Sequence, residues 1–77
     1  MNYENDDIET YLTTRDLAKR YDLKPDTIKR WRSLGRGPAF YKADQFALHP
    51  KAPRIRYRLS DVLAWEDTNN IFPINAN

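Results

Sequence analysis

Residues 11–35, YLTTRDLAKRYDLKPDTIKRWRSLG, decide the fold, because this stretch reads as two short helices joined by a tight turn. Thr13 is a suitable N-cap for the first helix, with Asp16 in the position that the Glu of a capping box usually takes. The apolar residues that follow share one helix face: Leu17, Ala18 and Tyr21. We expect this helix to end near Tyr21 and the turn to include Asp22 and Leu23.

The second helix is expected over residues 25–34. Pro25 suits its first position, where a missing N–H group costs nothing, and Asp26 favours the positive helix N-terminus. Gly35 is a suitable residue to end the helix. The residues expected to be buried are Ile28, Trp31 and Leu34. The opposite face carries Asp26, Lys29, Arg30 and Ser33, with Thr27 and Arg32 on its flanks.

The rest of the chain predicts a hairpin and a third helix. Gly35 to Pro38 turn the chain, residues 39–42 predict a short strand, and residues 54–58 alternate Arg with apolar residues as a second, antiparallel strand. Residues 43–53 form a long loop between them. Ser60 is expected to cap a helix over residues 61–67. We therefore divide the chain into an acidic flexible leader (1–10), one domain (11–67) and a C-terminal tail (68–77).

The net charge of +2 conceals an uneven distribution. The first nine residues hold four acids and no base, whereas residues 15–58 hold all 13 Lys and Arg residues against four acids, a local net charge of +9. Such a basic region predicts a polyanion-binding surface; a solvated basic surface without such a partner is the alternative. The absence of cysteine excludes disulfides and thiolate metal sites, and we expect no signal peptide and no membrane span.

The order of these motifs resembles the MerR-like winged helix-turn-helix family of small phage excisionases and AlpA-type regulators. The matching residues are Tyr11-Leu12-Thr13-Thr14, Leu17-Ala18, Thr27-Ile28-Lys29-Arg30-Trp31, Gly35-x-Gly37-Pro38 and Arg56-Tyr57-Arg58-Leu59-Ser60-Asp61-Val62. The resemblance implies an α+β, mainly α fold with three short helices and a two-stranded antiparallel wing. Two departures stand out: Lys24 replaces the Ser that commonly precedes the Pro of the second helix, and the wing loop 43–53 is unusually long.

In a helix-turn-helix, the second helix enters the major groove. Arg30 is the best candidate for base readout, because a guanidinium pairs bidentately with guanine. Lys29 and Thr27 are expected to contact phosphates, Lys24 adds a cation that reaches a phosphate, and Arg32 and Ser33 are assigned to either role. The alternative is a solvated face of an ordinary helix.

The turn and the wing supply a second set of expected DNA contacts: Arg36, Lys42, Arg54, Arg56 and Arg58. A basic hairpin beside a recognition helix commonly reaches the adjacent minor groove or its phosphates. Arg54 and Arg56 are the stronger candidates, because Arg58 has Asp61 nearby as a different partner. The alternative is a charged edge strand that prevents sheet-to-sheet pairing.

Other residues carry no predicted chemistry. The register of Trp31 with Ile28 indicates a core residue, and Tyr21, Tyr57 and Trp65 are assigned to the core as well. His49 is the only histidine, and no motif indicates an enzyme, a metal site, a cofactor or a small-molecule substrate. The apolar tail 71–74 is expected to pack over Trp65 and the first helix, or else to dock a partner.

We therefore expect a non-enzymatic protein that binds duplex DNA sequence-specifically. Its resemblance implies an excisionase-type factor that directs recombination, binds side by side with other copies, bends DNA and works with a phage integrase in the bacterial cytoplasm at the nucleoid. Transcriptional regulation of the AlpA type is the alternative role, and DNA packaging is a weaker one. The alternative of another class is a protein-interaction module that uses the same fold.

Overall fold

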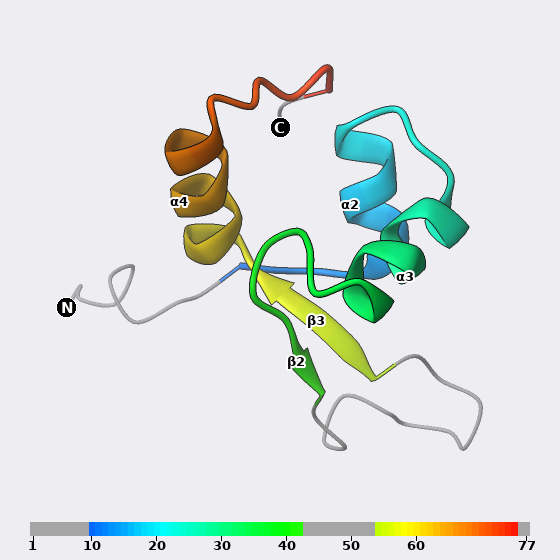
Figure 1. The fold of residues 1–77 in the computed structure, drawn as a ribbon. Coiled ribbons are helices and arrows are strands. Elements are labelled where there is room, and N and C mark those ends of the chain that lie inside the picture. Colours follow the sequence, from blue (N-terminus) through cyan, green and yellow to red (C-terminus); the bar gives the residue numbers. More distant parts are fainter. Residues whose placement is uncertain (1–9, 43–53, 76–77) are drawn as a thin grey trace, which may run out of the picture.

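The computed structural model describes residues 10–42 and 54–75. Its elements, in chain order, are β1 (Tyr11–Leu12), α2 (Thr14–Arg20), α3 (Pro25–Ser33), β2 (Tyr41–Lys42), β3 (Ile55–Arg58) and α4 (Leu59–Asn69). The α2–α3 unit and α4 stand on either side of the molecule above the sheet, and the β2–β3 hairpin extends away from the helices (Figure 1). The predicted fold class, mainly α with three helices and an antiparallel wing, is confirmed.

The sheet has three strands rather than the two predicted. β3 lies in the middle and pairs antiparallel with both neighbours, in the order β1-β3-β2. Leu12 lies opposite Tyr57 on one side, and Tyr41 lies opposite Arg56 on the other. β3 therefore forms the wing with β2 and also pairs with β1, the strand directly before α2. Both strands begin later than predicted: residues 39–40 of the predicted range 39–42 and residue 54 of the predicted range 54–58 are not part of them.

The capping box of α2 forms as predicted. The Asp16 N–H group donates to Thr13 Oγ1 at 3.0 Å, and the Thr13 N–H group donates to Asp16 Oδ2 at 3.0 Å. The predicted cap of the third helix is wrong, because the chain passes from β3 directly into α4. Arg58 is the N-cap of α4 without a side-chain cap bond, and Ser60 lies inside the first turn.

The core lies where α2, α3, α4 and β3 meet. Its fully buried large side chains are Leu17, Ile28, Tyr57 and Val62. The rings of Tyr21, Trp31 and Trp65 form a triangle beside them, with centroids 5.6–5.9 Å apart. These aromatic residues are core residues as predicted, although both tryptophans keep part of their surface exposed. Leu34 is not a core residue: it caps the end of α3 and is 57% exposed.

A buried ion pair joins α2 to α4. Arg20 donates two hydrogen bonds to the Glu66 carboxylate, from Nε at 2.6 Å and from Nη2 at 2.9 Å. The Tyr21 hydroxyl donates a third to Glu66 Oε2 at 2.5 Å. The hydrogen bonds from Arg20 lower the pKa of Glu66 against the opposing effect of burial. Burial and the same carboxylate raise the pKa of Tyr21.

The segment after α4 returns to α2. The N–H groups of Ile74 and Asn75 both donate to the carbonyl of Arg20, at 3.1 and 3.0 Å. Ile71 packs against the core, as predicted for the tail, whereas Phe72 is 83% exposed. None of the helices in the described part of the chain is long and apolar enough to cross a membrane. The predicted leader up to residue 9, and the wing loop 43–53 with His49, lie outside the described residues.

Candidate nucleic-acid interface

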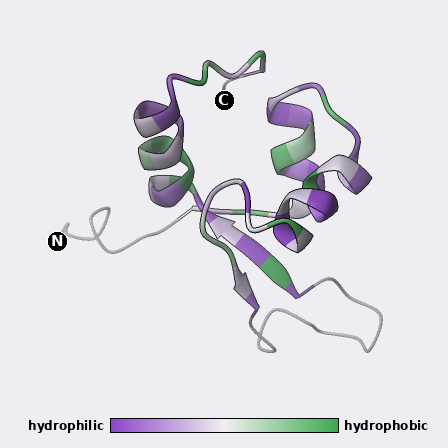
Figure 2. Cartoon of the chain, in the orientation of Figure 1, coloured by the Kyte–Doolittle hydropathy of each residue, from purple (hydrophilic) through white to green (hydrophobic). Residues whose placement is uncertain are grey.

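The outward face of α3 is polar and basic. Lys29, Arg30 and Ser33 are exposed on it, while Ile28 faces the core with no exposed surface. Figure 2 shows α3 as hydrophilic over most of its length. Lys29 Nζ lies 3.8 Å from Asp26 Oδ1, but both side chains are largely exposed, so this pair holds Lys29 only weakly. The exposed Arg30 side chain makes no hydrogen bond or ion pair with another described residue.

Two backbone hydrogen bonds close the turn between α2 and α3. The N–H group of Leu23 donates to the carbonyl of Ala18 at 2.8 Å, and that of Asp22 donates to Lys19 at 3.1 Å. Asp22 adopts the left-handed conformation, with φ 56°. These are the bonds of a Schellman motif with Asp in place of the usual Gly. Lys24 then precedes α3 as an N-cap whose side chain makes no cap bond.

The C-terminal end of α3 has the same motif as the end of α2, with Gly35 in the left-handed conformation at φ 69°. The N–H group of Arg36 donates to the carbonyl of Trp31 at 2.7 Å, and that of Gly35 donates to Arg32 at 3.2 Å. The C-terminal ends of α2 and α3 are therefore both fixed by backbone bonds, and Trp31 packs against the core from α3. This arrangement presents Lys24, Thr27, Lys29, Arg30 and Ser33 on a rigid helix, with Thr27 half-buried.

Arg32, assigned to DNA from the sequence, makes contacts within the chain. It is half-buried, and its Nη1 donates to Thr14 Oγ1 at 3.1 Å and to the Tyr57 hydroxyl at 2.8 Å. Its guanidinium also lies 5.7 Å from the centre of the Phe40 ring. Arg32 therefore joins α2, α3 and β3, which fixes α3 relative to the wing.

The wing arginines differ in their surroundings. Arg54 is exposed directly before β3, and Arg56 is half-buried with its Nη1 donating to the carbonyl of Ile55 at 2.9 Å. Arg58 makes the alternative contact considered from the sequence: its Nε lies 3.2 Å from Asp61 Oδ2. Arg58 also lies 4.7 Å from the centre of the Tyr41 ring. Arg36 and Lys42 are exposed.

The Tyr41 hydroxyl completes the contacts of Asp61, donating to Oδ2 at 2.9 Å. The hydrogen bond to Asp61 raises the pKa of Arg58, and it raises the pKa of Tyr41 as well. These three residues tie β2 and β3 to the first turn of α4. Arg58 thus connects the wing to α4 at the end of β3 that is next to this helix. Arg56 and Arg54 lie towards the other end of the hairpin.

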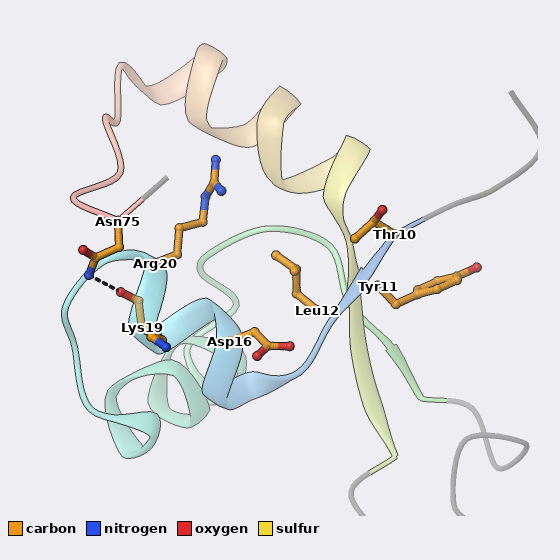
Figure 3. Close-up of a pocket in the computed structure, with 7 residues that line it drawn as sticks. All are labelled: Thr10, Tyr11, Leu12, Asp16, Lys19, Arg20 and Asn75. Atoms are coloured by element: carbon orange, nitrogen blue, oxygen red, sulfur yellow. Dashed lines mark hydrogen bonds between the residues drawn. The ribbon is translucent and has the colours of Figure 1, made fainter. Parts of the chain in front are cut away.

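Two of the hollows on the described surface differ in charge. One, between β1, α2 and the tail, mixes acid and base: Asp16, Lys19 and Arg20 line it, and Figure 3 shows Asn75 hydrogen-bonded to the Lys19 carbonyl at its edge. The other lies between α2, α3 and β3, and Arg15 lines it together with Lys29, Arg32 and Arg54. Arg15 was not among the site residues predicted from the sequence. The signal that could have indicated it is its place, as a cation, in the first turn of α2.

The arrangement defines a helix-turn-helix with a wing beside its second helix. A family described as "Helix-turn-helix domain" matches residues 11–70. The match covers more than half of the 77 residues, and the chain belongs to this DNA-binding family. No curated protein and no solved structure matches the chain. Among the described residues, no group of three or more His, Cys, Asp or Glu side chains is placed to hold a metal ion.

Proposed function

We propose that this protein binds duplex DNA sequence-specifically as an excisionase-type architectural factor, without enzymatic activity. The observation that supports this most directly is the exposed basic face of α3, with Lys29, Arg30 and Ser33 outward and Ile28 buried behind them. α3 enters the major groove, Arg30 reads base edges, and Lys29 and Lys24 contact phosphates. The wing, with Arg54 and Arg56, reaches the neighbouring minor groove or its backbone.

The small size of the reading surface supports a role with several copies. One α3 of nine residues reaches only a few base pairs, whereas specific DNA interfaces usually bury more surface than one such module provides. Copies bound side by side on repeated sites would supply the missing contacts and bend the duplex. In this role the protein directs a phage integrase towards excision, and it regulates a promoter where its sites overlap one.

A protein-interaction module is the second candidate, favoured by the exposed apolar tail. Phe72 is 83% exposed and Ile74 is 69% exposed, and both lie beyond the helix-turn-helix. Exposed apolar side chains in a chain of this size are suitable for contact with another protein. This role predicts weak duplex binding without sequence preference.

Selection from a random duplex pool with the purified protein tests the proposal. We expect an enriched motif in tandem repeats, with affinity that falls about a thousandfold between roughly 50 and 200 mM salt if about six phosphates are contacted. Inverted repeats would indicate dimer binding and favour the AlpA-type role instead. Salt-sensitive binding without a motif would mean that a partner supplies specificity. No duplex binding would favour the interaction module.

A further inference from the structure

The end of α2 is held by residues 71–75, the segment that follows α4 and that we call the strap. An α-helix leaves its last four carbonyl groups without partners inside the helix, so other groups must satisfy them. The Arg20 carbonyl accepts two hydrogen bonds from the strap, from the N–H groups of Ile74 at 3.1 Å and of Asn75 at 3.0 Å. The Asn75 side chain adds a third bond, because its Nδ2 donates to the Lys19 carbonyl at 2.8 Å (Figure 3). The strap therefore supplies three donors to the last turn of α2.

The other end of the strap is anchored to α4. The Ile71 N–H group donates to the Glu66 carbonyl at 2.9 Å, and the Ile71 side chain packs against the core. Figure 1 shows the strap crossing from the end of α4 towards α2. Arg20 is thus held twice, through its side chain by Glu66 of α4 and through its carbonyl by the strap. The family match ends at residue 70, so the strap lies outside the matched helix-turn-helix domain.

The turn that the strap supports leads directly into α3. Asp22 has a φ of 56° in this turn, a left-handed conformation that is costly for a residue with a side chain. The N–H group of Leu23 closes the turn on the Ala18 carbonyl, and Lys24 follows as the N-cap of α3. Because only Asp22 and Leu23 separate the C-cap of α2 from the N-cap of α3, a shift at the end of α2 moves the start of α3.

We propose that the strap belongs to the DNA-reading unit and that Asn75 is a positioning residue, which fixes the direction of α3 through the end of α2. The proposal rests on the proposed duplex binding and extends the reading unit beyond the matched domain to residue 75. A molecule whose strap is released keeps the side chains of α3 but presents them in a variable direction. Only the strapped fraction of the molecules then binds with full affinity.

The test compares two variants at Asn75 in the full chain. Asn75→Ala removes the bond to the Lys19 carbonyl, and Asn75→Pro also removes the N–H group that donates to the Arg20 carbonyl. Asn69→Ala is the matched control: Asn69 is also exposed, and its Nδ2 donates to a carbonyl at the same 2.8 Å, but that carbonyl belongs to Trp65 of the same helix. None of the three variants changes the charge of the chain.

Amide hydrogen exchange of the free protein measures the hold of the strap on the turn. We expect the protection of the Asp22 and Leu23 amides to fall about fivefold in Asn75→Ala and about 25-fold in Asn75→Pro, the factors for one and two ordinary hydrogen bonds. Asn69→Ala should leave both amides as protected as they are in wild type. Equal losses in Asn69→Ala would mean that the turn opens only with the whole fold, which would overturn the proposal.

Duplex binding measures the positioning role. On the selected duplex we expect Asn75→Pro to bind at least about fivefold more weakly than Asn69→Ala, with Asn75→Ala between them. The salt slope should be the same for all three variants, because no phosphate contact is removed.

The outcomes separate this inference from the proposed function. If the turn amides lose protection but Asn75→Pro and Asn69→Ala bind the duplex equally well, the strap does not position α3 and the proposal is wrong. If affinity falls while the turn amides keep their protection, Asn75 contacts the duplex itself, and the proposal is wrong as well. If wild type binds no duplex, the proposed function fails and the positioning role fails with it, whereas hydrogen exchange still decides whether the strap holds the turn.

Discussion

Arg20 and Glu66 form a bidentate ion pair across the core, 46 positions apart in sequence. Both residues are buried, at 8% and 6% exposure, and the Tyr21 hydroxyl donates to the same carboxylate. Tyr21, the C-cap of α2, is thus bonded to α4 as well. The pair fixes the end of α2, and through the following turn it fixes the direction of α3.

Glu66→Gln should destabilise the fold in a pH-dependent way. Because the pKa of Glu66 is lowered in the folded state, its contribution is complete above the unfolded pKa of about 4.3 and is lost as pH falls through the folded value. Removing one charge of a buried pair costs about 3 kcal/mol of unfolding free energy. Urea unfolding at neutral pH should show this loss, and the difference from wild type should shrink at strongly acidic pH.

Asp67→Asn is the matched control for that experiment, because Asp67 is exposed on the same helix. It should leave the unfolding free energy within about 0.5 kcal/mol of wild type. Equal losses in the two variants would contradict a specific role for the Arg20–Glu66 pair.

Gly37→Ala should be more damaging than Gly35→Ala, although both glycines have positive φ, 85° and 69°. A Cβ on Gly37 would lie 2.9 Å from Trp31 Cε3, whereas one on Gly35 meets nothing within 4 Å. We expect a loss of about 1 kcal/mol at Gly35 from the left-handed backbone alone. The loss at Gly37 should exceed it by a further 1–3 kcal/mol, about the cost of overpacking, because the indole must move. Thermal unfolding of the two variants side by side measures the difference, and equal melting temperatures would refute it.

Lys24→Ser should stabilise the protein and weaken DNA binding together. The N-cap Lys24 has an extended backbone and no side-chain cap bond, so a Ser hydroxyl there can accept the N–H group of Asp26. The N–H group of Thr27 already donates to the Lys24 carbonyl at 2.9 Å. We expect a gain of about 1 kcal/mol in unfolding free energy, and a decrease of about one in the salt slope of duplex binding. Lys24→Ala removes the same charge without adding a cap, so it should show only the second effect. A Ser variant no more stable than the Ala variant would rule out the cap.

Arg30→Ala and Lys29→Ala should affect DNA binding in different ways. Arg30 is assigned to a base edge, so its loss should cost about 1–3 kcal/mol on the selected site and relax the preference at one position. Lys29 is assigned to phosphate, so its loss should weaken all sequences about equally. Repeating the duplex selection with each variant measures both effects. If both variants bind as wild type does, α3 is not the recognition helix.

Local signals in the sequence predicted the helix-turn-helix closely. The capping box, the Pro at the start of α3 and the Gly after it act within one turn of chain, so their consequences are visible in adjacent residues. The apolar spacing likewise placed Leu17, Ile28 and Tyr57 in the core. Leu34 was misplaced because the helix ends before it, and its side chain then has no inner face to occupy.

Contacts between distant segments could not be predicted in this way. Nothing near Arg20 in the sequence indicates that Glu66 is its partner, and β1 has only two residues, too few for an alternating pattern. Arg32 carries the same charge as Arg30, and the positions of Thr14 and Tyr57, both distant in sequence, distinguish their surroundings. The cation-lined hollow could not be predicted for the same reason, because its arginines come from α2, from α3 and from the residue before β3.

The separation of Arg20 from Glu66 also sets an order of events during translation. At about 5–20 residues per second, roughly 2–9 seconds pass between the synthesis of the two residues. During that interval the nascent α2–α3 segment lacks the carboxylate that pairs Arg20 and the strand that pairs Leu12. Until β3 and α4 have been synthesised, α2 and α3 therefore lack the contacts with these two elements that hold them in the folded chain.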